Sequence, residues 1–430
     1  MGSNSSKSES LGPGNKPKYQ LEVYEAHNQG INVMALSEDG SILITAGDDR
    51  TIRTWSTQGG NCDCLATLEG HEDIIYCLAV DERHIWSGGA DKTVRKWDLE
   101  TGRALAVFRG HKSIVNRLLS TGDFVFSSSY DRSARCWDAD TGECIRVFVG
   151  HKRGVYPMAF VPGDDDDNDD KNNMNNNNNS DKIPENKDIL ITGSADHTAI
   201  IWSFETGRPV FVLKDHAGAV TCVTTDSQGK ILLTGSTDHT IRSWDIRQGT
   251  RLHVFEGHQS SVVCLTVANR MAYSGSSDHT ARSWVIEFGD CARVYKGHEH
   301  TISCLKYKDG LLFTGSGDGT AMCFGSKSGT LLRTFKGHEV SVNAIQVNGR
   351  LYTASYDKTL RAWDIFGLKE LVIMKKGNVF ETDDVTTNNN NNNNKVFNFF
   401  SGNNRNNSND NNNNNNITKR GMDEFDDDYQ

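Results

Sequence analysis

The chain has 430 residues, and length alone suggests two or three domains, since domains commonly run ~100 to 200 residues. Its formal net charge of −10 is concentrated in two segments: 164–188 holds nine acidic and three basic residues, and 377–430 holds nine and four. The rest is near neutral and has no basic stripe of the kind that follows phosphates, which excludes nucleic acid as an expected partner. Without a long apolar run or a secretory signal pattern, the chain is predicted to be cytoplasmic, with the nucleus as an alternative.

Residues 1–18 are predicted to form a flexible leader. They begin Met-Gly-Ser-Asn-Ser-Ser, which fits the N-myristoylation pattern M-G-x-x-x-[ST] and makes Gly2 a candidate lipidation site. A single acyl chain binds membranes only marginally, and Lys7, Lys16 and Lys18 add little positive charge. We therefore expect at most weak, reversible contact with a membrane; a leader without lipid is the alternative.

From residue 19 to 376 one pattern of side chains recurs eight times. A histidine comes first, an aspartate follows, and an aromatic residue stands six positions after the aspartate. The histidines are His27, His71, His111, His151, His216, His258, His298 and His338. The aspartates are Asp49, Asp91, Asp131, Asp196, Asp238, Asp278, Asp318 and Asp357. The aromatic residues are Trp55, Trp97, Trp137, Trp202, Trp244, Trp284, Phe324 and Trp363.

Each unit is predicted to contain four short antiparallel strands. Residues 231–247 show an apolar run, a polar turn and then alternating apolar and polar residues, which is typical of strand, turn and strand. Two further strands are expected at 219–223 and 252–255. Four strands in about 40 residues is the blade pattern of a β-propeller. The predicted units are about 19–56, 57–98, 99–138, 139–203, 204–245, 246–285, 286–325 and 326–376.

The repeated polar residues are interpreted as structural. The aspartate lies in a turn, where its carboxylate can accept N–H groups, and the histidine and the indole N–H can join the same network. Eight copies at one offset favour architecture over a hydrolase triad, so we expect no enzyme activity and no cofactor. The ten cysteines are scattered and predicted to be buried reduced thiols; Cys62 and Cys64 lack a second pair at zinc spacing, so no metal is expected.

This frame resembles that of the WD40 repeat family over residues 19–376, and Gly70-His71 to Trp97-Asp98 shows the full signature. The resemblance implies an all-β propeller of eight four-stranded blades in a single ring, monomeric and working as a protein-interaction scaffold. The seventh unit departs from the pattern because Phe324 lacks an indole donor, which predicts a weaker network there.

Two segments compete to be the outermost strand that closes the ring. Tyr19 to Tyr24 aligns with the strand that precedes the other histidines, and Leu371 to Met374 lies at the matching offset after the last tryptophan. We favour the N-terminal segment because it leads into a histidine loop, as the internal copies do.

Two Asn-rich segments interrupt or follow the repeats. The insertion 164–187 and the tail 377–430 are too polar to offset the entropy of ordering and are predicted to be disordered. The apolar stretch Val396 to Phe400 in the tail is the exception, and it can dock on a partner or on the propeller.

Candidate partner-binding residues lie at two offsets around the central axis that the propeller implies: directly after the first apolar residue of the first strand, and directly before the turn aspartate. Arg117 is added to them because it lies beside Asn116. Large aromatics are favoured anchors of interfaces. The candidates are Tyr76, Asn116, Arg117, Tyr130, Tyr156 and Tyr356.

A second functional hypothesis comes from one blade. Trp244-Asp245-Ile246-Arg247 resembles the WDxR box through which substrate receptors of cullin-4 ubiquitin ligases contact the ligase adaptor. The resemblance makes Trp244, Asp245 and Arg247 the adaptor-binding residues. Scaffold and ligase receptor both remain open from the sequence, as does the identity of the partners.

Overall fold

The computed structural model describes residues 17–59, 62–163, 183–184, 186–369 and 371. Within these residues, 32 β-strands form eight four-stranded antiparallel sheets, and one helical turn follows near residue 368. No helix in this described part is long and apolar enough to cross a membrane.

The eight sheets are the predicted blades, but their bounds are shifted from the predicted units: each sheet contains the last three strands of one unit and the first strand of the next unit. Blades one to four are β2 (Ile31–Leu36), β3 (Ile42–Gly47), β4 (Ile52–Ser56) and β5 (Cys64–Leu68); β6 (Ile75–Val80), β7 (His84–Gly89), β8 (Thr93–Asp98) and β9 (Ala104–Arg109); β10 (Val115–Ser120), β11 (Phe124–Ser129), β12 (Ser133–Asp138) and β13 (Cys144–Val149); β14 (Val155–Val161), β15 (Ile189–Ser194), β16 (Ala199–Ser203) and β17 (Pro209–Leu213). Blades five to seven are β18 (Val220–Thr225), β19 (Ile231–Ser236), β20 (Ile241–Asp245) and β21 (Arg251–Phe255); β22 (Val262–Ala268), β23 (Met271–Ser276), β24 (Ala281–Val285) and β25 (Cys291–Tyr295); β26 (Ile302–Lys308), β27 (Leu311–Ser316), β28 (Thr320–Gly325) and β29 (Leu331–Lys336). Blade eight is β30 (Val342–Asn348), β31 (Arg350–Ser355), β32 (Thr359–Trp363) and β1 (Gln20–Glu25).

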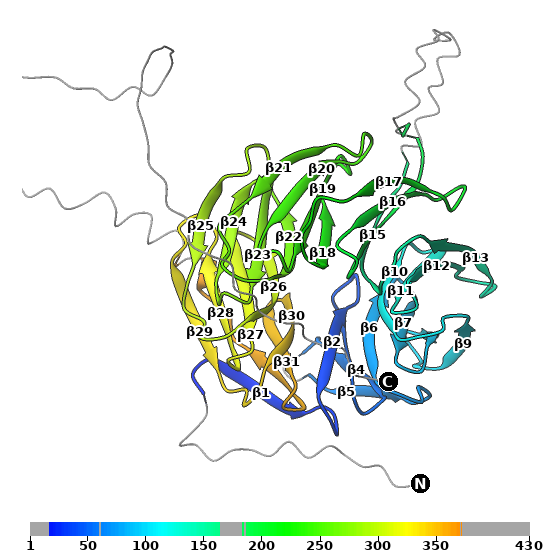
Figure 1. Cartoon of the computed structure of the whole chain (residues 1–430). Coiled ribbons are helices and arrows are strands. Elements are labelled where there is room, and N and C mark those ends of the chain that lie inside the picture. Colours follow the sequence, from blue (N-terminus) through cyan, green and yellow to red (C-terminus); the bar gives the residue numbers. More distant parts are fainter. Residues whose placement is uncertain (1–16, 60–61, 164–182, 185, 370, 372–430) are drawn as a thin grey trace, which may run out of the picture. The chain divides into compact units, whose positions relative to one another are not determined.

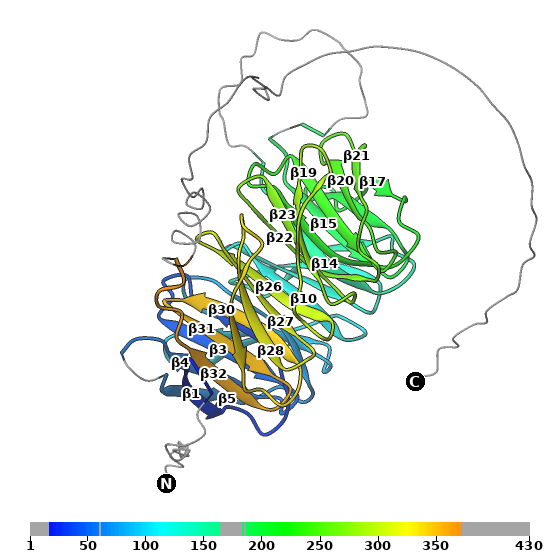
Figure 2. The same cartoon turned by 90° about the vertical axis from the view of Figure 1, so that its left-hand side faces the viewer.

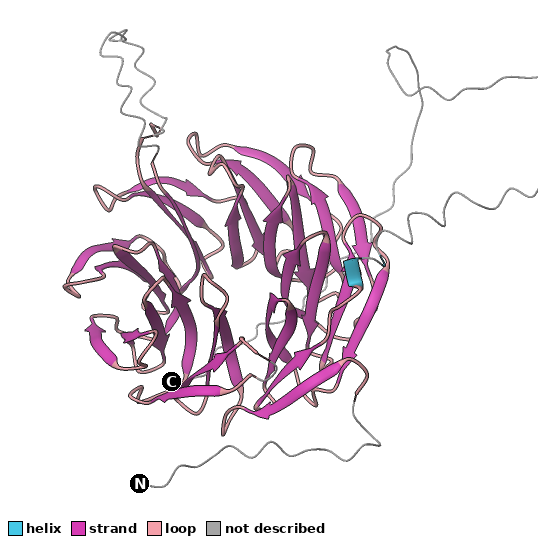
Figure 3. Cartoon of the chain, turned by 180° about the vertical axis from the view of Figure 1, so that it is seen from behind, coloured by secondary structure: helices cyan, strands magenta, loops and turns pink. Residues whose placement is uncertain are grey.

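The blades follow one another in a closed ring (Figures 1 and 3). Each inner strand contacts the inner strand of the next blade, and β30 of blade eight contacts β2 of blade one. The prediction of an eight-bladed propeller is therefore confirmed.

The N-terminal strand closes the ring. In Figure 2, β1 lies beside β32, and the two strands pair antiparallel with Val23 opposite Arg361. The preference for Tyr19 to Tyr24 is confirmed in this respect. The competing segment does not take that place: Leu371 belongs to the helical turn, and residues 372–374 lie outside the described residues.

Arg333 of β29 fastens the same seam. Its guanidinium lies 4.0 Å from the centre of the Tyr19 ring and donates to the carbonyl oxygens of Asp364 (2.6 Å) and Phe366 (3.3 Å). One side chain of blade seven thus contacts the residue before β1 and residues after β32, the two strands that pair at the seam, through a cation–π contact and charge-assisted hydrogen bonds.

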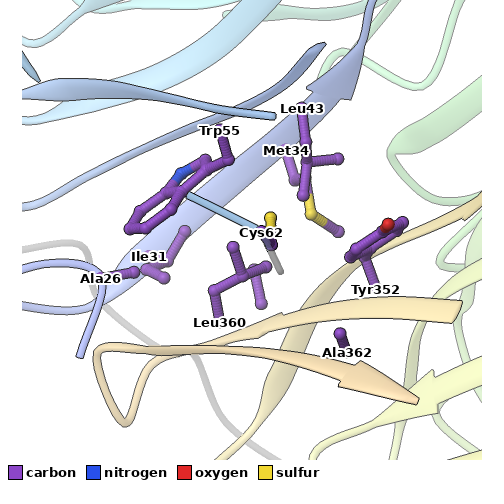
Figure 4. Packing of buried hydrophobic residues seen from close by; sticks show 10 residues of the cluster. Ala26, Ile31, Met34, Leu43, Trp55, Cys62, Tyr352, Leu360 and Ala362 are labelled. Carbon is purple, nitrogen blue, oxygen red and sulfur yellow. The ribbon is translucent and has the colours of Figure 1, made fainter. Parts of the chain in front are cut away.

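The hydrophobic core lies between the faces of neighbouring blades. Figure 4 shows Ile31, Leu43 and Trp55 of blade one against Tyr352 and Leu360 of blade eight. The second strand of each blade is almost completely buried, because its apolar residues contact sheets on both sides, whereas the outermost strand is half exposed. A rigid ring of this kind holds its connecting loops in fixed positions.

The described end of the insertion differs from the expectation of disorder for 164–187. Ile183 is only 8% exposed, packs in the cluster around Trp244, and its N–H donates to the carbonyl of Arg247 (2.9 Å). The physical reason is the apolar side chain, which gains by leaving water. Residues 164–182 and 185, the leader 1–16 with Gly2, and the tail from residue 372 with Val396 to Phe400 lie outside the described residues.

Candidate protein-interaction face

All eight blades contain the predicted hydrogen bonds of histidine with aspartate and with a strand hydroxyl, and seven of them add the indole. In blade eight, His338 Nδ1 lies 2.8 Å from Asp357, His338 Nε2 lies 2.7 Å from the Thr353 hydroxyl, and the Trp363 indole donates to that hydroxyl (2.8 Å). A hydroxyl that accepts from the indole can donate to Nε2, which leaves Nδ1–H to donate to the carboxylate. The histidine–aspartate distances in all eight blades are 2.7 to 3.0 Å.

The carboxylate of each network stays ionised. Burial on its own raises the pKa of Asp357, but hydrogen bonds from His338, Thr359 and backbone N–H groups outweigh burial and hold the pKa below its usual value. The other seven aspartates are lowered in the same way. Every acceptor position of these carboxylates is used inside the blade, so the networks are architecture.

Blade seven shows the predicted defect. Phe324 is buried and packs edge to face against Tyr295, and no indole reaches Thr314. The Thr314 hydroxyl is 2.8 Å from His298 Nε2, which is the one hydrogen bond described for it. Thr314 and Thr353 are therefore a matched pair that differ by one indole donor.

Thr353→Val is expected to destabilise the propeller by about 1–3 kcal/mol more than Thr314→Val, because it also leaves a buried indole N–H without an acceptor. Both threonines are fully buried, and valine has nearly the same shape in each place. Urea unfolding followed by tryptophan fluorescence measures the two losses. Equal losses would show that the indole hydrogen bond contributes nothing.

The histidine loops and the turns that carry the aspartates lie on one face of the ring, which we call the histidine face. Each loop leads into an inner strand, and each turn joins the second and third strands of a blade. The loop backbone is tied to the turn: the N–H of Glu339, next to His338, donates to Asp357 (3.1 Å). The networks thus fix the shape of this face.

Four of the predicted partner-binding residues are tyrosines, and the structure brings them together as an arc on the histidine face. Tyr76, Tyr130 and Tyr356 are 39%, 44% and 50% exposed, and Tyr156 is half buried. Tyr130 meets Tyr156 edge to face at 5.1 Å. Burial raises the pKa of Tyr76, and Asp48, Asp73, Tyr130 and Tyr356 act on it in the same direction.

Glycines of the next blade hold two of these rings in place. A Cβ atom on Gly154 would come within 2.9 Å of the Tyr130 ring, and one on Gly30 within 2.4 Å of the Tyr356 ring. Any larger residue would displace the aromatic side chain, so the absence of a side chain lets each ring lie against the backbone. Rings that are fixed before binding lose little entropy when a partner arrives.

Asn116 has a structural role that sequence reasoning missed. Its amide donates to the Val155 carbonyl of the next inner strand (3.1 Å), as Asn32 does to Ile75 (3.1 Å) and Asn343 to Ile31 (2.8 Å). Thr221 and Ser303 make equivalent bonds with their hydroxyls. This position joins neighbouring blades wherever a short donor occupies it, so Asn116 is not a free contact residue. Among the described residues, Tyr76 and Tyr156 occupy the same position without making that bond.

The remaining candidate residues differ in whether their side chains are available to a partner. Arg117 is exposed on β10 and stays a candidate for binding. Arg247 is half buried and donates to the carbonyls of Pro184 (2.9 Å) and Lys187 (2.8 Å), so its guanidinium already holds the end of the insertion. Trp244 is 4% exposed and belongs to the network of blade five. The adaptor contact predicted for these residues competes with contacts inside the chain.

The cysteines differ partly from expectation. Seven are buried or half buried, but Cys64, Cys144 and Cys291 are exposed at the start of outermost strands, which have solvent on one side. All ten are free thiols. In the described part of the chain, no group of three or more histidine, cysteine or acidic residues is placed to hold a metal ion.

Comparison with known proteins assigns the family. The model of the family "WD domain, G-beta repeat" matches residues 18–56, 62–98, 102–138, 207–245, 249–284, 289–324 and 329–364, which is more than half of the chain. The chain therefore belongs to the WD repeat family. Blade four, which carries the insertion, lies outside these segments yet contains the same network through His151, Asp196 and Trp202.

Similar proteins include eukaryotic translation initiation factor 3 subunit I of Xenopus tropicalis, 34% identical over 87 residues, and the CCR4-associated factor 4 homolog of Candida glabrata, 34% identical over 93 residues. These matches cover 20% of this chain and 26% and 16% of the two proteins, so the chain spans only about a quarter or less of their length. Among solved structures, the computationally designed Ika8 protein matches with a TM-score of 0.70 and 28% identity over 81% of this chain and all of the designed chain. The closer likeness of 111–117, 127–132 and 312–318 to WD repeat-containing protein 86 stays a prediction.

Proposed function

We propose that this chain is a non-enzymatic scaffold that binds partner proteins on the histidine face. The observation that carries the proposal is the tyrosine arc: Tyr76, Tyr130, Tyr156 and Tyr356 gather on one face, three of them exposed, and two are held by glycines of the next blade. Tyrosine is enriched at binding hot spots because it combines a large apolar ring with a polar tip.

The distribution of histidine and aspartate supports a role without catalysis. The eight repeated histidines are each 9% exposed or less, and both ring nitrogens of each have partners within the blade. A general base must reach the proton that it removes, and these imidazoles face buried hydroxyls. Among the relatives, one is named as a subunit and another as an associated factor; association with other proteins is the property that we carry over to this chain.

Replacing Tyr76, Tyr130 and Tyr156 with alanine together is expected to remove most partners of the chain, because hot-spot residues contribute most of the binding energy of an interface. Proximity labelling in cells, with the wild type and the variant at equal abundance, measures the loss. The matched control replaces Phe288 and Phe366, which are 63% and 85% exposed at the opposite ends of the strands, and should keep the partner set. An unchanged partner set for the tyrosine variant would refute the face as the binding site.

The ligase receptor hypothesis has less support from the contacts described. Adaptor binding through Arg247 requires its guanidinium to leave the carbonyls of Pro184 and Lys187, with which it makes charge-assisted hydrogen bonds. We keep the scaffold as the proposal and place the chain in the cytoplasm, with reversible membrane contact if Gly2 carries a lipid.

A further inference from the structure

The inner strands of the ring have an unusual charge composition. None of β2, β6, β10, β14, β18, β22, β26 and β30 contains an acidic residue, and their cations are Arg117, Lys306 and Lys308. Arg117 is exposed, and no hydrogen bond or ion pair of its side chain is found among the described residues. An arginine in this place has no carboxylate from the inner strands to neutralise it.

Arg117 is exposed on an inner strand, and the inner strands of the eight blades contact one another around the axis of the ring. Burial raises the pKa of the Cys77, Cys222 and Cys264 thiols, and the Arg117 guanidinium acts on each of them in the opposite direction. These cysteines belong to blades two, five and six, whereas Arg117 belongs to blade three. This electrostatic influence on three other blades agrees with an exposed guanidinium that faces the space enclosed by the inner strands. The equivalent residues of the other blades are uncharged: Val33, Cys77, Pro157, Cys222, Cys264, Cys304 and Ala344.

Four more cations lie in the loops and turn of blades three and four on the histidine face. Lys112, Lys152 and Arg153 are exposed in the histidine loops, and Arg132 is exposed in the turn of blade three. The described residues provide no ion pair for any of them. The turn carboxylates of these two blades, those of Asp131 and Asp196, are used by the networks of their blades.

The tyrosine arc therefore has a basic end and an end of mixed charge. Tyr130 and Tyr156 lie among the cations, and Arg153 acts electrostatically on Tyr156. Toward blades two and eight the loops carry the exposed acidic residues Glu72, Asp73 and Glu339, whereas the turns carry the exposed Lys92 and Lys358. Complementary charge steers a partner to the face and fixes its direction, which favours a ligand that is anionic at one end.

We propose that the histidine face binds an extended segment of a partner protein whose anionic side chain, a carboxylate or a phosphate, pairs with Arg117 while its flanking residues lie along Tyr76, Tyr130 and Tyr156. The inference rests on the proposed function and adds the chemistry of the partner. A guanidinium matches the planar carboxylate or the phosphate through two parallel hydrogen bonds. The cations in the loops and turn of blades three and four strengthen the attraction and add to its dependence on salt.

The test uses the full chain, immobilised, and four libraries of synthetic peptides that differ only in the central residue. Glutamate and phosphoserine give the two anionic arms, and glutamine and serine give their uncharged counterparts. We expect at least one anionic library to be retained about tenfold more than its counterpart, with the advantage lost in Arg117→Leu and reduced at high salt. The arm that is retained identifies the anion as carboxylate or phosphate.

Arg109→Leu is the matched control, because Arg109 is an exposed arginine on the outermost strand β9 of blade two and should leave binding unchanged. Thermal unfolding checks that both variants fold. Equal retention of charged and uncharged libraries, or full retention by Arg117→Leu, would overturn the inference. If peptides bind without regard to charge but the tyrosine variant loses them, the scaffold proposal stands and the anionic partner is wrong.

Discussion

A chain that begins at Ala26, and so lacks β1, is expected to lose the cooperative unfolding of the propeller. The truncation removes the outermost strand of blade eight, a ladder in which Gln20 to Glu25 pair with β32, and it removes Leu21 and Tyr24 from the core at the seam. Two partly buried apolar side chains and a strand ladder together stabilise by on the order of 5 kcal/mol. This is a large part of the free energy of unfolding of a typical domain.

The truncated chain should also aggregate, because it leaves β32 as an unpaired edge. Calorimetry and light scattering measure both effects. A chain that begins at Pro17 removes only residues outside the described part and is the control; it should unfold like the full chain. If the chain that begins at Ala26 unfolds at the same temperature as the control, β1 does not close the ring.

The sequence predicted those features that one repeat determines alone. The histidine, the aspartate and the tryptophan of a network lie within one blade. Their fixed spacing along the chain therefore produces the same arrangement in each blade. The same holds for the strand order and for the loss of an indole at Phe324. Repetition of the pattern in eight copies is itself what distinguishes architecture from a catalytic site, because a catalytic site needs one such group of residues.

Features that depend on contacts between blades could not be predicted in this way. The Asn116 amide reaches a carbonyl of blade four, and Arg247 reaches the end of the insertion that precedes β15. Side chains at one offset of the repeat were expected to share one role. Whether such a side chain forms a hydrogen bond to the next blade depends on the residues of that blade, which the repeat pattern does not show.

Acid is expected to unfold the propeller in a transition that steepens below about pH 4. The eight network aspartates have a pKa lower in the folded chain than in the unfolded chain, so the unfolded chain binds more protons as the pH falls. Their contribution is complete above the ordinary aspartate pKa of about 3.9 and is lost as the pH falls toward the folded value. In this range each such carboxylate lowers the free energy of unfolding by about 1.4 kcal/mol for each pH unit.

Two histidines begin to lower the free energy of unfolding at a higher pH than the aspartates do. Burial lowers the pKa of His258 and His338, although Asp278 and Asp357 act in the opposite direction. A histidine whose pKa is lowered in the folded state stabilises it fully above the unfolded value of about 6.5 and loses that contribution as the pH falls below it. The free energy of unfolding should therefore decline gently from about pH 6.5 and steeply below about pH 4.

Urea unfolding at a series of pH values, followed by tryptophan fluorescence, measures this curve. Asp278→Asn removes one network carboxylate, so the variant should be less stable at pH 7 and lose less stability on acidification than the wild type. Asp123→Asn is the control, since Asp123 is exposed in the turn before β11 and belongs to no network. A variant at Asp278 with the acid dependence of the wild type would mean that the network carboxylates do not set the acid limit, and that the histidine face is held together by packing alone.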